Sequence, residues 1–199
     1  MVRKSEQEMI DESRRSGRQL ATALLNGAEP RSVDVRVALQ RGEYCVGQVP
    51  VHVYQYVTGD GVYVKKSGGW MIGGGLIGAA ISAASITTNV VGNAARRAEA
   101  ARDAAAHWEF AEQATVYLTS RRWSLSTATT WVDWWFNGIR ASDCNGKMVT
   151  LELAGQPRVG LVMPHPDYWF VMFHKLAYDR VPMPPQPSDE IGPPGIGAA

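Results

Sequence analysis

The sequence contains little of what marks the commoner functional classes. It has two cysteines and four histidines in 199 residues, and its formal net charge is +1. Cys45 and Cys144 lie far apart with no CxxC motif, so they predict neither a disulfide framework nor a zinc site but reduced thiols in a cytosolic protein. A nearly neutral chain also argues against a general nucleic-acid binder, which usually carries a strong basic excess.

Motifs for secretion and catalysis are missing too. Residues 1–20 contain basic side chains but no apolar run behind them, so we expect no secretory signal peptide. The sequence has no G-x-S-x-G or HExxH motif, and Gly73-Gly74-Gly75 is not followed by the Lys-Ser/Thr of a phosphate loop. We therefore expect no enzyme activity, no cofactor and no metal.

Two groups of polar residues would contradict that expectation if they formed a site. Asp103 and His107 are four residues apart on a predicted helix, but no third ligand lies nearby, so a solvated pair is the simpler interpretation. His165, Asp167 and His174 cluster in the last helical region, where a helix cap and surface positions explain them as well. A deep pocket gathering these three residues would favour an enzyme.

The chain begins with a predicted helix, Ser5–Asn26, followed by an irregular lead-in up to residue 40. Charges crowd the first half of this helix. Its apolar residues at helical spacing fall in the second half: Leu20, Ala21, Leu24 and Leu25. The helix is therefore expected to be a loosely attached surface helix, with docking of a partner as the alternative.

Strand-like segments lie on both sides of the middle of the chain. Glu43–Thr58 alternates apolar and polar residues, and the turn Thr58-Gly59-Asp60-Gly61 followed by Val62–Val64 predicts a hairpin. Asn145-Gly146 predicts a second hairpin within a three-stranded meander. The later predicted strands are 115–119, 123–126, 131–140, 147–153 and 158–163. The tryptophans among them, at positions 123, 131, 134 and 135, are expected to pack in the core and at its rim rather than to stack ligands.

A final helix and a tail complete the chain. Pro164-His165-Pro166-Asp167 opens the helix, which runs to about Tyr178. Trp169, Phe173, Leu176 and Ala177 form its core-packing face. From Pro182 onward the Pro/Gly-rich sequence predicts a disordered tail over residues 182–199.

The segment Trp70–Gly92 carries no charge and is followed by an Ala-rich predicted helix, Asn93–Gln113. Its length suits a bilayer, but a single crossing would separate strands that share one domain, and a return through the charged Ala-rich helix is costly. Small residues recur at Gly74, Gly78 and Ser82. They predict either close helix packing, within the chain or with another copy, or shallow membrane contact.

Two sets of residues follow from these alternatives. The self-association or membrane-contact set is Gly74, Gly78, Ser82, Ile77 and Ile81. The set of cations that could meet anionic lipid or phosphate is Lys65, Lys66, Arg96, Arg97, Arg121 and Arg122.

The element order, with strands and then one closing helix, resembles a small PH-like barrel. The segment Val116-Tyr117-Leu118-Thr119-Ser120-Arg121-Arg122-Trp123 resembles the "LTdrR" strand-turn-strand of bacterial PH-like and GRAM-like domains. Trp134-Trp135-Phe136 and Val159–Val162 resemble the strands that follow it. More narrowly, the chain resembles actinobacterial proteins of this class with a Gly/Ala-rich insertion ahead of that motif. Ser120 departs from the family's usual Asp or Asn.

The resemblance implies an α+β fold in which a C-terminal helix closes an antiparallel PH-like β-barrel. Three regions are then expected: 1–40, a helix and lead-in; 41–181, the PH-like domain with a helical-hairpin insertion over 68–113; and the tail. The family implies a non-enzymatic binding or scaffolding module that contacts protein, itself included, or a membrane surface. We expect a cytoplasmic location, with contact at the inner face of the cell membrane. The alternative is an integral membrane protein anchored by Met71–Val91.

Overall fold

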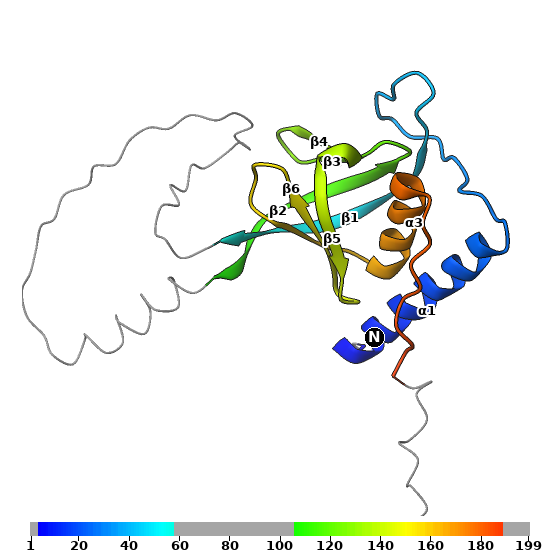
Figure 1. The fold of residues 1–199 in the computed structure, drawn as a ribbon. Coiled ribbons are helices and arrows are strands. Elements are labelled where there is room, and N and C mark those ends of the chain that lie inside the picture. The colour runs from blue at the N-terminus through cyan, green and yellow to red at the C-terminus, as the bar shows by residue number, and fades with distance from the viewer. Residues whose placement is uncertain (1–3, 58–105, 189–199) are drawn as a thin grey trace, which may run out of the picture. The chain divides into compact units, whose positions relative to one another are not determined.

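The computed structural model of the chain describes residues 4–57 and 106–188. Contacts divide the chain into two compact units, residues 1–56 with 108–199 and residues 57–107. Nearly all of the second unit lies outside the described residues, so the sheet and helices of Figure 1 belong to the first unit apart from two strand ends. The predicted strand Val62–Val64 also lies outside them.

Seven antiparallel strands form one sheet in the described part of the chain. Their spatial order is β4-β3-β2-β1-β7-β6-β5, so most strands lie beside their neighbours in sequence and the last lies beside the first. The strands are β1 (Cys45–Val57), β2 (His107–Thr119), β3 (Arg122–Ser126), β4 (Trp131–Trp135), β5 (Ile139–Cys144), β6 (Met148–Leu153) and β7 (Val159–Val162). The predicted meander of the last three strands is confirmed.

The sheet is open, so the prediction of a closed barrel is wrong. Its edges, β4 and β5, are consecutive in sequence, and the 3-10 turn η1 (Phe136–Gly138) joins them. This turn interrupts the single strand predicted over 131–140 and carries the chain from one edge to the other, and no described residues pair β4 with β5. In Figure 1, β5 and β6 run across the direction of β1 and β2, so the sheet bends strongly along its width.

Local sequence rules explain several of these strands. β1 buries Val49, Val51 and Val53 and turns His52 outward, as its alternation predicts. At the predicted second hairpin, Gly146 has a φ of 84°, and the Asn145 side chain accepts hydrogen bonds from the amides of Lys147 and Met148, each 3.0 Å long. A left-handed residue at this position suits the twist of a tight antiparallel turn.

The prediction of a helix over Asn93–Gln113 is wrong for residues 107–113, which lie in the described part of the chain and belong to strand β2. The helix propensity of these residues is overridden by aromatic contacts with β1. The rings of Trp108 and Tyr56 lie 5.1 Å apart, and those of Phe110 and Tyr54 lie 5.7 Å apart. Cross-strand aromatic pairs of this kind stabilise a sheet and are invisible to a local helix pattern.

Two helices pack together on the sheet. Helix α3 (Pro166–Tyr178) places the buried Phe173 ring 5.6 Å from Trp123 and 5.2 Å from Phe136, in the core. Of its predicted core face, Phe173 is fully buried, whereas the other three residues are half-buried. Helix α1 (Glu6–Leu25) packs on α3, where Ala21 and Leu24 meet Val171. Its predicted start is confirmed, because Ser5 caps it in a capping box with Glu8.

The first half of α1 is not loosely attached, which corrects the prediction. Gly17 lies so close to α3 that a Cβ there would be 2.7 Å from Cβ of Asp167 and 2.9 Å from Cγ of Pro184. One turn earlier, the Ser13 hydroxyl donates to the Asp167 carboxylate at 2.6 Å and accepts from the Asp167 amide at 3.0 Å. This buried contact fixes the N-terminal half of α1 against the start of α3.

Residues 182–188 form a C-terminal strap along α1, so the predicted disorder of the tail is wrong for this part. Arg18 donates to the Pro184 carbonyl at 2.8 Å, and Asp11 accepts from the backbone and hydroxyl of Ser188 at 2.9 and 2.6 Å. The earlier strap residue, Pro184, contacts the later helix residue, Arg18, whereas the later strap residue, Ser188, contacts Asp11. The strap therefore runs antiparallel to the helix. The Pro-rich strap cannot form a core of its own, and contacts with side chains of α1 hold it in place instead. Residues 189–199 lie outside the described part.

The contact between Ser188 and Asp11 predicts how the pKa of Asp11 responds when Ser188 is replaced. The hydrogen bonds from Ser188 lower the pKa of Asp11, so this contact contributes stability above the ordinary carboxyl pKa and loses it as the pH falls through the lowered value. In Ser188→Ala we expect the pKa of Asp11 to rise, measured by NMR titration of the carboxyl carbons. Glu8 is the internal control, because Ser5 lowers its pKa. An unchanged Asp11 pKa would show that the strap does not hold this carboxylate.

Candidate functional site

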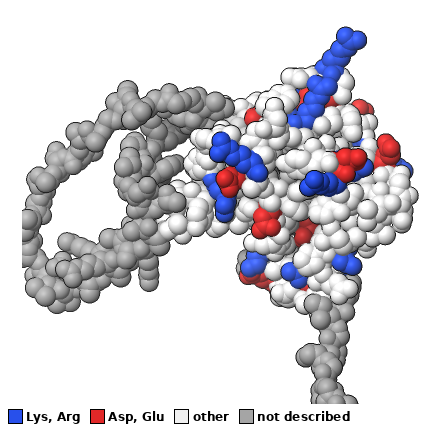
Figure 2. All heavy atoms as spheres, viewed as in Figure 1, with Lys and Arg blue, Asp and Glu red and all other residues white. Residues whose placement is uncertain are grey.

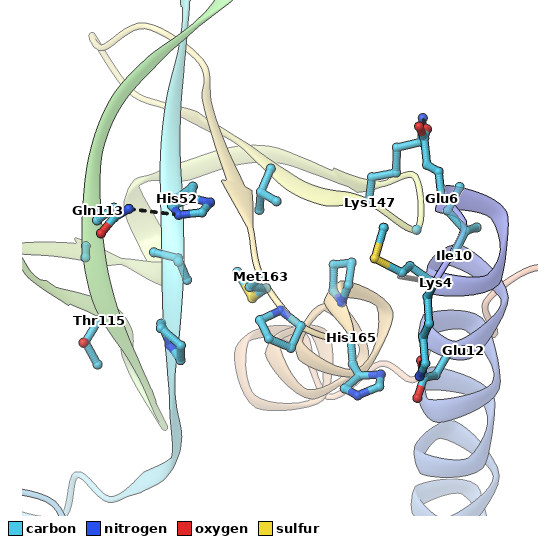
Figure 3. A pocket seen from close by; sticks show the side chains of 18 of the residues that line it. Lys4, Glu6, Ile10, Glu12, His52, Gln113, Thr115, Lys147, Met163 and His165 are labelled. Atoms are coloured by element: carbon cyan, nitrogen blue, oxygen red, sulfur yellow. Dashed lines mark hydrogen bonds and ion pairs between the residues drawn. The ribbon is translucent and has the colours of Figure 1, made fainter. Parts of the chain in front are cut away.

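A groove of about 1050 Å³ lies between α1 and one end of the sheet. Figure 3 shows β1 and β2 on one side of this α1–sheet groove and α1 on the other, with Met163 and His165 between them. The segments that line it are the start of α1 and residues 50–52, 113–115, 126–128, 146–147 and 162–166. Six separate parts of the chain therefore converge on it, which is typical of a binding site built by tertiary structure.

The interior of the groove is apolar. Val51 and Ala114 are buried residues in the middle of β1 and β2, the buried Met163 directly follows β7, and Ile10 closes the groove from α1. Met9 also lines the groove, with 53% of its surface exposed. A methionine that remains half-exposed at the mouth of an apolar groove is a flexible contact for an apolar ligand.

The charged rim of the groove is internally neutralised. Lys147 forms an ion pair with Glu6, joining the β5–β6 hairpin to α1, and Lys4 pairs with Glu12 at 2.5 Å. The rim thus places two cations and two anions around the mouth, each beside an opposite charge. Such exposed pairs contribute little stability, but they leave no excess positive charge for an anionic ligand.

Two histidines line the groove, but neither is held by a catalytic partner there. His52 contacts the Gln113 amide at 3.2 Å. His165 adopts the left-handed conformation, with φ of 51°, where the chain reverses from β7 into α3. The cluster predicted with His165 does not form a pocket. Asp167 bonds Ser13, and His174 lies elsewhere on α3, 3.0 Å from Ser142.

The Ser142–His174 contact is the kind of pair that could suggest nucleophilic chemistry. Neither residue lines the groove, and His174 is surrounded by the rings of Phe170, Phe173 and Tyr178. Burial lowers the pKa of His174, with a smaller contribution from the charge of Arg180. A neutral imidazole packed among aromatic rings fits a structural role for this pair.

Arg122 was predicted as an anion contact, and the structure contradicts this. Its side chain is 8% exposed, and its Nε lies 3.1 Å from the buried Glu43 carboxylate, although the N–H is not aligned as a hydrogen bond. Its other nitrogens donate to Asp133 at 3.0 Å and to the Ala38 carbonyl at 2.8 Å. The guanidinium therefore ties the lead-in segment to β3 and β4, and its burial keeps it from a ligand at the surface.

The neighbouring residues complete this buried network. The Thr119 hydroxyl donates to Glu43 at 2.6 Å, and Ser124 donates to Asp133 at 2.6 Å. Arg121 is exposed, but it too contacts the lead-in, through Gln40 at 3.3 Å. The segment that carries the PH-like resemblance thus has a structural role in this chain.

The other residues singled out from the sequence lie partly inside and partly outside the described part of the chain. Trp123 and Trp134 are buried and Trp131 is half-exposed, which confirms core and rim packing. The remaining predicted contacts lie outside the described residues, so they stay predictions: Gly74, Ile77, Gly78, Ile81, Ser82, Lys65, Lys66, Arg96 and Arg97.

The groove itself was missed from the sequence. Met9 and Ile10 are adjacent apolar residues in the charged half of α1, and they were the available signal. They could not be paired with β1 and β2 without knowing that α1 folds back across the end of the sheet. A local pattern identifies apolar side chains but not the distant segments that face them.

Charge and metal chemistry give no competing site in the described part. On the face drawn in Figure 2, basic and acidic side chains are interspersed. Residues 4–57 and 106–188 contain no group of three or more potential metal ligands. Over the same ranges, no helix is both long enough and apolar enough to cross a bilayer.

No protein-family model matches the chain, and no curated protein matches it.

The two cysteines are expected to be unreactive in the folded protein. Burial raises the pKa of Cys45, and burial together with the nearby Asp167 charge raises that of Cys144. Because the thiolate is the reactive form, both should resist iodoacetamide at mildly alkaline pH and react fully in urea, as measured by mass spectrometry. Equal labelling of Cys144 with and without urea would contradict this burial.

The Arg122 network is expected to dominate the stability of this end of the sheet. Arg122→Ala leaves Glu43 buried without a counter-charge and should lower the free energy of unfolding by about 3–5 kcal/mol in urea denaturation. The matched control Arg121→Ala removes an exposed neighbour and should cost about 1 kcal/mol or less. Similar losses for the two variants would show that the buried ion pair has no special weight.

Proposed function

We propose that this protein is a non-enzymatic binding module and that the α1–sheet groove takes an apolar segment of a partner protein. The observation that carries this proposal is the combination of an apolar interior with a neutralised rim. At about 1050 Å³ the groove lies at the upper end of the range for small-molecule sites. A short peptide segment with large apolar side chains suits that size.

The charges favour protein over an anionic membrane surface at this site. Lys4 and Lys147 both face carboxylates, so a phosphate headgroup would have to displace an existing ion pair. A partner segment needs no such exchange, because its apolar side chains would contact Val51, Ala114 and Met163. Its polar backbone groups would then meet the hydroxyl of Ser126.

The groove also favours binding over catalysis. In the described part of the chain neither groove imidazole is hydrogen-bonded to a carboxylate, and the hydroxyl of Thr127 bonds its own turn at the Thr130 carbonyl. General-base catalysis needs a side chain held within hydrogen-bond reach of the proton that it takes from the reacting group. The lining residues are instead arranged as an apolar surface with scattered polar contacts.

We further propose a relationship to PH-like and GRAM-like domains. The support is the strand order, in which consecutive strands lie side by side and a helix follows the last strand. The open sheet differs from the expected closed barrel. Cytoplasmic location, with contact at the inner face of the cell membrane, remains part of this proposal. The alternative anchor Met71–Val91 and the self-association residues stay predictions.

Two α1 variants test the proposed groove. Peptides selected from a displayed random library on the wild-type protein should be rich in apolar residues. Met9→Glu adds a charge at the groove and should weaken their binding about tenfold or more in isothermal calorimetry. Leu25→Glu makes the same kind of change at another exposed apolar residue of α1, which does not line the groove, and should leave binding unchanged.

The same variants separate protein from membrane binding. Vesicles containing anionic phospholipid are sedimented with wild-type protein and with Met9→Glu. The proposal expects no pelleting that depends on Met9. Equal peptide affinities for Met9→Glu and Leu25→Glu would overturn the groove as the binding site, and vesicle binding lost in Met9→Glu would assign it to membrane instead.

A further inference from the structure

The edge strand β4 presents unpaired backbone groups in a defined pattern. Its register with β3 is continuous from Trp131 to Trp135. Hydrogen bonds flank this register at both ends, from the Phe136 amide to the Arg121 carbonyl at 3.1 Å and from the Thr127 amide to the Thr130 carbonyl at 2.9 Å. Antiparallel hydrogen-bonded pairs alternate, so Val132 and Trp134 bond to β3. Trp131, Asp133 and Trp135 therefore turn their amides and carbonyls away from β3.

These outward groups lie at an open edge. Among residues 4–57 and 106–188, no strand pairs with β4 on the side away from β3. The nearest polar contact there is the Thr130 hydroxyl, 3.4 Å from the Trp131 carbonyl. β4 has no proline, lysine or register shift, the devices by which proteins commonly block an edge. The other edge, β5, has a register shift between Ile139 and Ala141, and α3 lies against it.

The outward-facing side chains of β4 are symmetric about its centre. Val132 and Trp134 are buried, whereas the outer face reads Trp131, Asp133, Trp135, the same in both directions. A two-fold axis requires a surface that matches itself, with each residue meeting the same partner from both copies. An antiparallel strand pair centred on Asp133 meets that requirement.

We propose that two copies of this chain associate through β4, joining their sheets edge to edge. Trp131 lies opposite Trp135 of the partner subunit, and Asp133 lies opposite Asp133 of the partner subunit. The three outward residues of each copy exchange backbone hydrogen bonds across the axis. Trp131, 49% exposed and stacked 5.5 Å from Tyr117, gains an aromatic neighbour and loses contact with water.

The central aspartates do not prevent this pairing. Each Asp133 carboxylate is held toward its own β3 by Arg122 at 3.0 Å and by Ser124 at 2.6 Å. Both contacts direct the carboxylate toward its own sheet and away from the outer edge of β4, so the two carboxylates do not point at each other across the axis. A partner of different sequence would have no reason to match the Trp-Asp-Trp symmetry, which is why a second copy is the proposed occupant.

The first test compares two lysine substitutions on exposed aromatic residues. Wild-type protein should sediment as a dimer that dissociates on dilution, and Trp131→Lys should weaken the dimer about tenfold or more. Phe110→Lys is the matched control, because Phe110 is 50% exposed on the far end of β2. It should remain dimeric, as should Met9→Glu, so that failure of the groove proposal leaves this result unaffected. A monomeric wild type, or equal effects of the two lysines, overturns the proposal.

The second test measures the register of the proposed pair of β4 strands. In an antiparallel hydrogen-bonded pair, opposed Cα atoms lie about 5.5 Å apart, within the range of a disulfide. Asp133→Cys should therefore form an intersubunit disulfide under mild oxidation. Thr129→Cys lies away from the axis and should not, and wild type under the same oxidant controls for Cys45 and Cys144. Asp133→Ser checks that the fold survives without the carboxylate. A folded Asp133→Ser, with no cross-link in Asp133→Cys, rejects the two-fold pairing.

Discussion

The close contact between α1 and the start of α3 is the constraint on which the rest of the structure depends. At Gly17 there is no room for a Cβ between the helix and Asp167. The Ser13 hydroxyl then bonds both the carboxylate and the amide of that residue. This contact holds the first turns of α1 opposite the ends of the strands, where they form one wall of the groove. It also leaves the outer side of α1 to the C-terminal strap.

The open sheet has a separate internal tie, the buried ion pair of Arg122 and Glu43. It joins the lead-in to β3 and β4 at the end of the sheet where the 3-10 turn leaves for β5. Because the sheet does not close, β4 keeps a free edge within the described part, and none of its residues lines the groove. The proposed partner groove and the proposed dimer edge are thus built by different contacts, so one can fail experimentally without the other.

The sequence predicted those elements whose signals are local. The start of the first helix at Ser5, the alternation of β1, the Asn145-Gly146 turn and the proline at the start of α3 each depend on a few neighbouring residues, and all four are found. The predictions that were wrong concern segments whose structure depends on residues distant in sequence. Residues 107–113 form a strand because aromatic rings of β1 lie beside them, and the strap is ordered by side chains of α1 some 170 positions earlier. The groove likewise depends on α1 lying opposite β1 and β2, which are distant from it in sequence.

Gly17→Ala tests the central constraint most directly, because two physical effects then have opposite signs. Inside a helix, replacing glycine by alanine should stabilise by up to about 1 kcal/mol through propensity alone. A Cβ 2.7 Å from that of Asp167 should instead force α1 away from α3. Hydrogen exchange should therefore become faster along α1 and the strap in Gly17→Ala, while the amides of β1 and β7 keep their protection. Slower exchange along α1 in the variant than in wild type would contradict the account.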